Sequence, residues 1–237
     1  MKSFQATCDP FVVKIQEIYQ STDNLFQNAL AVILLAVQEK VRNAELKKKY
    51  LVCITGASGS IYGIRTIKAL LEVGHELHVV VSAWGSQVIE RETGKPFALW
   101  MDELKLPPKR VYAPEDLSAP PASGSFRLDG TVVVPCSMNT AGAIASGVCL
   151  NLIHRAALTS LKEGRPLILA PRETPLSLVD LRNLTGLAEA GAAILPCSPA
   201  FYHAPQNMDE LINFVVGKIL DRLSIEHNLY TRWEGLQ

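Results

Sequence analysis

From Tyr50 to the end of the chain, short apolar runs alternate with stretches in which apolar residues recur at helical spacing. The runs predict five buried strands, near residues 50–55, 76–82, 131–135, 166–171 and 192–196. The helical stretches predict six helices, near residues 60–73, 84–92, 138–146, 151–163, 176–190 and 207–223. Strands that alternate with helices are typical of a parallel sheet with helices on both faces. The pattern therefore predicts a three-layer α/β fold with a mostly parallel sheet.

The first 49 residues follow a different pattern. Phe11 to Tyr19 has helical spacing, and Leu25 to Leu46 reads as a second helix. That helix closes in Lys47-Lys48-Lys49, where cations suit a helix C-terminus. We therefore expect a helical N-terminal extension over residues 1–49 and an α/β domain over residues 50–237. A helical hairpin, an oligomer contact and a disordered leader all fit this extension.

The stretch from Leu51 to Gly63 is the most informative part of the domain. An apolar strand is followed by the glycine-rich turn Thr55-Gly56-Ala57-Ser58-Gly59-Ser60 and then by a helix, which is typical of a nucleotide-binding unit in a Rossmann- or flavodoxin-like fold. The glycine spacing is not that of a dinucleotide site, and the second strand ends at Ser82 without the acid that holds a ribose. We therefore expect a mononucleotide phosphate at this turn, where the helix N-terminus attracts anions. A tight turn without a ligand is the alternative.

Composition narrows the function class. The 237 residues carry 23 basic and 23 acidic side chains, so no global field favours nucleic acid or an anionic membrane. The longest apolar run near Ala29 to Val37 has nine residues, well short of the ~20 of a membrane helix. None of the five cysteines forms a C-x-x-C pair, and buried, reduced thiols in a cytoplasmic protein explain them most simply.

Polar residues follow each predicted strand, and the carboxyl ends of parallel strands meet at the ligand-binding edge of the sheet. Ser137-Met138-Asn139-Thr140 suits hydrogen bonding to a ligand, and Arg172 offers a planar fork of donors to phosphate or to a flavin ring. A surface ion pair with Glu173 is the alternative. Tyr202 lies in a proline-bracketed loop, while Lys162 and Lys218 taken alone read as solvated helix cations. The long segment from Pro107 to Asp129 reads as irregular.

Taken together, these motifs resemble the UbiX family of flavin prenyltransferases, from about Tyr50 to the end of the chain. The matching pieces occur in family order: Thr55-Gly56-Ala57-Ser58-Gly59 with Tyr62-Gly63, Ser82, Ser123-Gly124-Ser125-Phe126, Pro135-Cys136-Ser137-Met138, Arg155-Ala156-Ala157, Leu161-Lys162-Glu163, Pro171-Arg172-Glu173-Thr174-Pro175, Pro199-Ala200-Phe201-Tyr202-His203 and Arg232-Trp233.

The resemblance implies transfer of a dimethylallyl group from dimethylallyl phosphate to N5 and C6 of reduced FMN, without metal. The product, prenylated FMN, is the cofactor of UbiD-type decarboxylases, and family members form dodecamers with sites shared between subunits. By position, the FMN-binding residues would be Gly56, Ala57, Ser58, Ser82, Ser137, Met138, Asn139, Thr140 and Arg172. The residues around the donor would be Tyr202, Lys218, Lys162, Arg172 and Trp233, and the catalytic residues Glu173, Glu92 and Ser58.

Two other functions stay open at this point. A flavin-binding regulatory or structural subunit would bind FMN without turnover. A decarboxylase of the related phosphopantothenoylcysteine type relies on a histidine after the first helices, and no histidine occurs between Met1 and Gly74. Monophosphate and diphosphate donors are both compatible with the sequence, as are quinone biosynthesis and aromatic-acid decarboxylation as destinations of the product.

Overall fold

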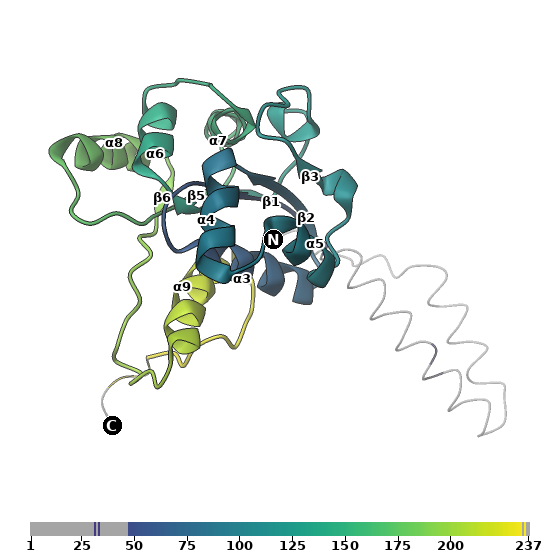
Figure 1. Cartoon of the computed structure of the whole chain (residues 1–237), viewed down its shortest axis with the longest axis vertical. Helices are drawn as coiled ribbons and strands as arrows, with labels where there is room; N and C mark the ends of the chain where they lie inside the picture. Colours follow the sequence, from purple (N-terminus) through teal and green to yellow (C-terminus); the bar gives the residue numbers. More distant parts are fainter. Residues whose placement is uncertain (1–30, 32, 34–46, 234, 236–237) are drawn as a thin grey trace, which may run out of the picture. The chain divides into compact units, whose positions relative to one another are not determined.

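A six-stranded sheet lies at the centre of the computed structural model, which describes residues 31, 33, 47–233 and 235 (Figure 1). All its described ladders are parallel, and the strand order is β3-β2-β1-β4-β5-β6. The strands are β1 (Lys49–Ile54), β2 (Glu76–Val81), β3 (Val111–Tyr112), β4 (Gly130–Cys136), β5 (Leu167–Pro171) and β6 (Ala193–Ile194). The expected α/β class is confirmed.

Helices cover both faces of the sheet. Successive residues of a strand point to opposite faces, so one strand contributes side chains to both cores. On β1, Val52 and Ile54 face a core shared with α3 (Ser60–Glu72), α4 (Ala83–Thr93), α5 (Phe97–Glu103) and α9 (Met208–Arg222). Leu51 and Cys53 face a second core formed with α6 (Met138–Ala145), α7 (Leu152–Lys162) and α8 (Leu178–Glu189). The two cores give the molecule its three layers.

The five expected strands and six expected helices are all present, with ends shifted by a few residues. The sequence interpretation missed α5 and β3, and it was wrong about the segment from Pro107 to Asp129. That segment contains β3 and two short 3₁₀ helices, Pro108–Arg110 and Pro120–Ala122. A strand of two residues is too short to show a period, so the apolar pattern alone did not reveal β3.

The helices expected within residues 1–49 lie almost wholly outside the described residues, so the N-terminal extension stays a prediction. The chain from Lys48 onward forms one compact unit, which contains all the helices and strands named above. Among the helices that the structure describes, none is long and apolar enough to cross a bilayer.

Candidate functional site

The strand order reverses between β1 and β4, so the chain leaves these two neighbouring strands toward opposite sides of the sheet. Crevices of this kind, beyond the carboxyl ends of the strands, are where α/β sheets bind ligands. Thr55 joins the two strand ends here. Its hydroxyl donates to the Pro135 carbonyl oxygen at 2.8 Å and accepts from the Ser137 N–H at 2.8 Å. The two loops that follow β1 and β4 are therefore held in register.

A cavity of about 450 Å³, here called the switch-point hollow, opens at this place. Its lining combines small, polar and aromatic side chains: Thr55, Gly56, Ser82, Trp84, Ser137, Asn139, Thr140, Ala143, Leu150, Asn151 and His154. Five of the residues expected to bind FMN are among them, namely Gly56, Ser82, Ser137, Asn139 and Thr140. The volume lies within the range of small-molecule sites.

The residues of the hollow suit a phosphorylated flavin. Ser82 and Ser137 cap α4 and α6, accepting main-chain N–H groups of Gly85 at 3.0 Å and Thr140 at 3.3 Å. The amides left over in a first helical turn point outward and attract anions. Gly56 allows the turn after β1 to pack closely against Trp84, because a Cβ there would lie 2.7 Å from the Cβ of Trp84.

The N-terminus of α3 is already occupied by Glu92, from the end of α4. Its carboxylate accepts the main-chain N–H of Gly59 at 2.9 Å, the N–H of Ser60 at 2.8 Å and the Ser60 hydroxyl at 2.7 Å. These two amides are therefore taken by a carboxylate in this structure, and the expectation that the turn binds a phosphate stays a prediction. Burial alone would raise the pKa of Glu92, but the hydrogen bonds, including one from Ser58, lower it. Glu92 thus stands as a carboxylate beside Ser58.

Arg172 and Glu173 follow β5 directly. The Arg172 Nε donates to the Ser58 carbonyl oxygen at 3.0 Å, and the Arg172 main-chain N–H donates to the Cys136 carbonyl oxygen at 3.4 Å. The Glu173 side chain is exposed, and one of its oxygens accepts the Thr174 N–H at 3.2 Å. Three of the expected site residues, Ser58, Glu92 and Arg172, are therefore brought together next to the switch-point hollow.

Tyr202 lies in a second group of aromatic residues near the C-terminus. Its ring meets Trp233 edge-on, with centroids 5.5 Å apart, and meets Phe214 of α9 in the same way at 6.0 Å. The Tyr202 hydroxyl donates to the Thr231 carbonyl oxygen at 3.4 Å. Tyr202 and Trp233 are 45% and 57% exposed, so both leave a face open to a ligand.

Lys218 belongs to a cluster around Asp221, here called the Asp221 cluster and made of Lys218, Asp221, His227, Tyr230 and Arg232. Asp221 accepts Arg232 Nη2 at 2.7 Å, lies 3.1 Å from His227 Nε2 and also accepts the Tyr230 hydroxyl, while Lys218 Nζ lies 3.7 Å away. Burial alone would raise the pKa of Asp221, but Arg232 and Tyr230 lower it to about 2. The cluster ties the C-terminal segment to α9.

Comparison with known proteins decides the family. The Flavoprotein family model matches residues 38–220. A flavin prenyltransferase UbiX of Saccharolobus solfataricus is 42% identical over 193 residues, which are 81% of this chain and 94% of that protein. The chain belongs to the UbiX family of flavin prenyltransferases.

Two solved structures agree with the family. AnUbiX (PadA1), solved in complex with FMN and dimethylallyl pyrophosphate, has a TM-score of 0.77 at 41% identity and covers 81% of this chain and 100% of its own. A dodecameric FMN-dependent UbiX-like decarboxylase from Escherichia coli O157:H7 has a TM-score of 0.74 at 41% identity, over 79% of this chain and 100% of its own. The flavodoxin-like fold of this chain is thus that of UbiX proteins.

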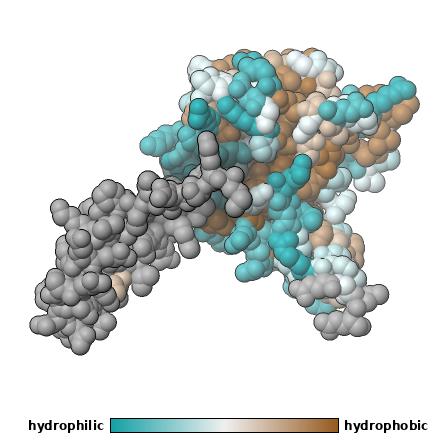
Figure 2. Space-filling view, turned by 180° about the vertical axis from the view of Figure 1, so that it is seen from behind, coloured by the Kyte–Doolittle hydropathy of each residue, from teal (hydrophilic) through white to brown (hydrophobic). Residues whose placement is uncertain are grey.

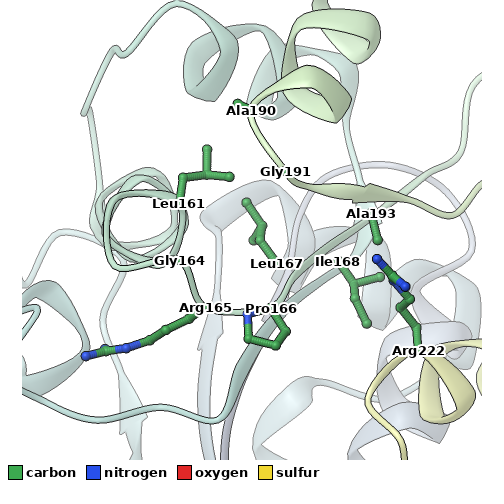
Figure 3. Close-up of a pocket in the computed structure, with 10 residues that line it drawn as sticks. All are labelled: Leu161, Gly164, Arg165, Pro166, Leu167, Ile168, Ala190, Gly191, Ala193 and Arg222. Atoms are coloured by element: carbon green, nitrogen blue, oxygen red, sulfur yellow. The ribbon is translucent and has the colours of Figure 1, made fainter.

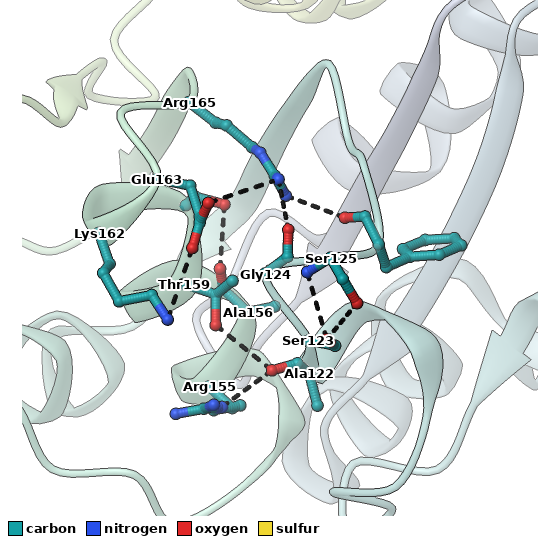
Figure 4. A network of polar contacts seen from close by, with 12 residues as sticks. Ala122, Ser123, Gly124, Ser125, Arg155, Ala156, Thr159, Lys162, Glu163 and Arg165 are labelled. Atoms are coloured by element: carbon teal, nitrogen blue, oxygen red, sulfur yellow. Dashed lines mark hydrogen bonds and ion pairs between the residues drawn. The ribbon is translucent and has the colours of Figure 1, made fainter.

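Not all the residues expected from the UbiX resemblance lie together within one chain. Lys162 is the last residue of α7 and precedes β5, whereas Arg172 directly follows β5. The two residues therefore lie at opposite ends of the β5 strand, Lys162 on the amino-end side of the sheet and Arg172 on the carboxyl-end side. Around Lys162, Arg165 donates to the carbonyl oxygen of Phe126 at 2.9 Å, and Arg155 donates to that of Ala122 at 2.9 Å (Figure 4). The Lys162 Nζ lies 3.5 Å from Glu163 and is otherwise directed to solvent. Two arginines therefore hold the Ala122–Phe126 loop beside Lys162.

A cavity of about 380 Å³ lies on the amino-end side of the sheet, between α7, β5 and the start of β6 (Figure 3). Its lining includes Leu161, Arg165, Leu167 and Arg222. None of the residues expected to act in UbiX chemistry lines it, so it plays no part in the candidate site.

Sequence reasoning missed three residues at or near the candidate site. Trp84 and His154 line the switch-point hollow, and Asp221 fixes the segment that carries Trp233. A signal was present for His154, because it stands three residues after Asn151, a helix-capping residue type at the start of a predicted helix. No sequence signal paired Asp221 with residues nine and eleven positions further on.

Proposed function

We propose that this protein transfers the dimethylallyl group of dimethylallyl phosphate to N5 and C6 of reduced FMN. The observation that carries the proposal is the grouping of Ser58, Glu92 and Arg172 beside the switch-point hollow, in a chain 41% identical to a protein solved with FMN and dimethylallyl pyrophosphate. In the balanced reaction the C–O bond of the allyl phosphate breaks and bonds to N5 and C6 form. Of the two hydrogens displaced from N5 and C6, one goes to the allyl carbon that loses its double bond, and the other leaves with inorganic phosphate. The flavin gains one C5H8 unit.

We assign the flavin to the switch-point hollow and the neighbouring turn. Gly56, Ala57 and Ser58 would lie along it, Ser82 and Ser137 to Thr140 would bind it, and Arg172 would hold its ring end. The capping hydroxyls and the volume of the hollow support this assignment. FMN supplies the nucleophilic ring atoms; the residues described here bind and orient it.

We assign the donor to Tyr202, Lys218, Arg172 and Trp233, with Glu173 as acid–base group. An allyl phosphate ionises when cations stabilise its leaving group and a proton is available. The exposed aromatic faces of Tyr202 and Trp233 would stabilise positive charge on the allyl group. Among the described residues, no group of three or more His, Cys, Asp or Glu side chains is arranged to hold a metal ion.

We further propose a homo-oligomer, a dodecamer like its relative, in which Lys162 of one copy completes the site of another. The position of Lys162 on the amino-end side of the sheet supports a shared site. Large apolar residues exposed on α8 support an interface: Leu178 at 62%, Val179 at 65% and Leu181 at 48%. Figure 2 shows that apolar and polar areas lie side by side on the face of the molecule opposite to that of Figure 1.

We also propose that prenylated FMN passes to a UbiD-type decarboxylase and that the protein works in the cytoplasm. The thiols of Cys53 and Cys136 support a reducing compartment, because neither is in a disulfide.

The deciding experiment is anaerobic incubation with reduced FMN and dimethylallyl phosphate, followed by mass spectrometry of the extracted flavin. We expect a gain of C5H8. We expect Glu173→Gln to lower turnover at least tenfold with little change in FMN affinity, because Glu173 would act on the donor. Glu115→Gln, at an exposed loop carboxylate, is the matched control and should leave both unchanged. Unmodified flavin that still binds would favour a regulatory flavin-binding subunit, and equal loss of turnover and FMN affinity would refute the role of Glu173.

A further inference from the structure

Three helices begin at the switch-point hollow. Their capping side chains, Ser82 of α4, Ser137 of α6 and Asn151 of α7, all line it. Each helix N-terminus carries about half a positive charge. The N-terminus of α3 is unavailable, because Glu92 takes the main-chain N–H groups of Gly59 and Ser60. An anionic group of a ligand in this hollow is therefore directed to the α4, α6 and α7 ends.

A histidine at the same place points to the ligand independently. His154, the third residue of α7, lines the hollow although it is only 6% exposed. Its main-chain N–H donates to the Asn151 side chain at 3.0 Å, which fixes the first turn of α7. The ring lies beside the residues that precede α7, because its Nδ1 is 3.3 Å from the main-chain nitrogen of Leu150.

The hydrogen bonding of the ring decides which nitrogen carries the proton. The main-chain N–H of Leu150 lies 3.3 Å from Nδ1, and an N–H can only donate, so Nδ1 is the acceptor. Burial lowers the pKa of His154, so the ring is neutral and its one proton sits on Nε2. Within the part of the chain that the structure describes, no group accepts a hydrogen bond from Nε2. Nε2 is not among the described buried polar atoms that lack a partner, so it is open to the hollow and can donate to a ligand there.

We propose that His154 recognises the phosphate of FMN, donating from Nε2 to a phosphate oxygen at the shared ends of α4, α6 and α7. The inference rests on the proposed binding of FMN in the switch-point hollow and adds the direction in which FMN lies. The phosphate is at His154, and the flavin ring extends toward Ser58 and Arg172.

The test compares FMN with riboflavin, which lacks the phosphate, by quenching of flavin fluorescence on titration with the flavin-free protein. His154→Asn keeps an oxygen near the Nδ1 position for the Leu150 N–H and removes the Nε2 donor. We expect it to bind FMN about tenfold to a hundredfold more weakly, the usual effect of losing a hydrogen bond to a charged group. Riboflavin affinity should not change, and His154→Gln, which places an N–H near the Nε2 position, should restore much of the FMN affinity.

His78→Asn is the control for a merely structural effect. His78 is also buried, at 5% exposure, but both its ring nitrogens are paired, with Tyr112 at 2.7 Å and Glu76 at 3.0 Å. Its substitution should lower thermal stability without changing the ratio of the FMN and riboflavin affinities.

Two results would overturn the role of His154: His154→Asn binding FMN as tightly as the wild type, or losing FMN and riboflavin affinity equally. A wild-type chain that binds the two flavins equally well would also overturn the role of His154. If that chain still transferred the prenyl group, as measured by mass spectrometry, the proposed function would stand. A wild-type chain that binds neither flavin would refute the proposed function, and this inference with it.

Discussion

The Asp221 cluster makes a quantitative prediction about the C-terminal segment. Asp221→Asn keeps the shape of the side chain but removes the charge that Arg232, Tyr230 and His227 share. The segment that these residues anchor carries Trp233 against Tyr202, 5.5 Å between ring centroids. The substitution should therefore weaken both the fold and the proposed donor site.

The size of the effect follows from the pKa of Asp221. A fall from 3.8 to about 2 corresponds to about 2 kcal/mol of extra stability at neutral pH. Asp221 itself is 22% exposed, but the Arg232 and Lys218 side chains are 55% and 48% exposed, so water and salt weaken their attraction. We therefore expect a loss of about 1–2 kcal/mol, which for a domain of this size lowers Tm by about 2–8 °C.

The pH dependence has a definite sign. Because the folded-state pKa is depressed, the stability from Asp221 is fully present above about pH 4 and is lost as the pH falls through about 2. Urea unfolding should thus separate wild type and Asp221→Asn most at pH 6–7 and progressively less below pH 4. The gap at pH 7 should also shrink in about 1 M NaCl.

A matched control is Glu103→Gln, which removes the surface ion pair of Glu103 with Lys95. Glu103 is 56% exposed, so its loss should cost at most about 1 kcal/mol. In prenyl-transfer assays Asp221→Asn should raise KM for dimethylallyl phosphate more than it lowers kcat. An Asp221→Asn protein that melts within a degree of the wild type at pH 7, or whose deficit is unchanged at pH 3, would refute this reasoning.

Two further substitutions test the turn after β1. Glu92→Gln should lower the free energy of unfolding by about 1 kcal/mol at neutral pH, because a charged acceptor at the α3 N-terminus is lost. Since the pKa of Glu92 is lowered, the deficit in Tm should shrink below about pH 4.5. A deficit that stays constant with pH would contradict this prediction. Gly56→Ala should weaken FMN binding severalfold, because its Cβ would lie 2.7 Å from the Cβ of Trp84; unchanged affinity in a fluorescence titration would show that Trp84 yields freely.

Much of the fold was predictable from the sequence because local signals agree with the packing. All of β1 after its first residue is buried, which is why its apolar run was readable. Capping residues also mark helix starts, as at Ser137 and Asn207. The start of α8 was placed early, although Ser177 and Asp180 form a capping box that fixes it at Leu178.

The site was only partly predictable, because its key contacts join distant residues. The motif Thr55–Ser60 located the turn, but nothing in the motif indicates that Glu92, 33 residues after Gly59, fills the helix N-terminus. The same limit applies to Lys162. Its motif placed it with the donor site, while the topology of α7 and β5 places it on the amino-end side of the sheet. Spacing along the chain carries no information about such pairings.

The occupation of the α3 N-terminus also orients the proposed reaction. With Glu92 ionised there, a second anion at Gly59 and Ser60 would meet a like charge, which disfavours a phosphate at the turn that the glycine pattern first indicated. Under the proposed roles, the phosphate then goes to the α4, α6 and α7 ends, and the flavin ring extends toward Arg172. Under the same roles, Arg172 and Lys218 would bind the phosphate of the donor. In this proposal the Glu92 carboxylate, which reaches from α4 to the glycine-rich turn, would keep the two phosphates of the reaction apart.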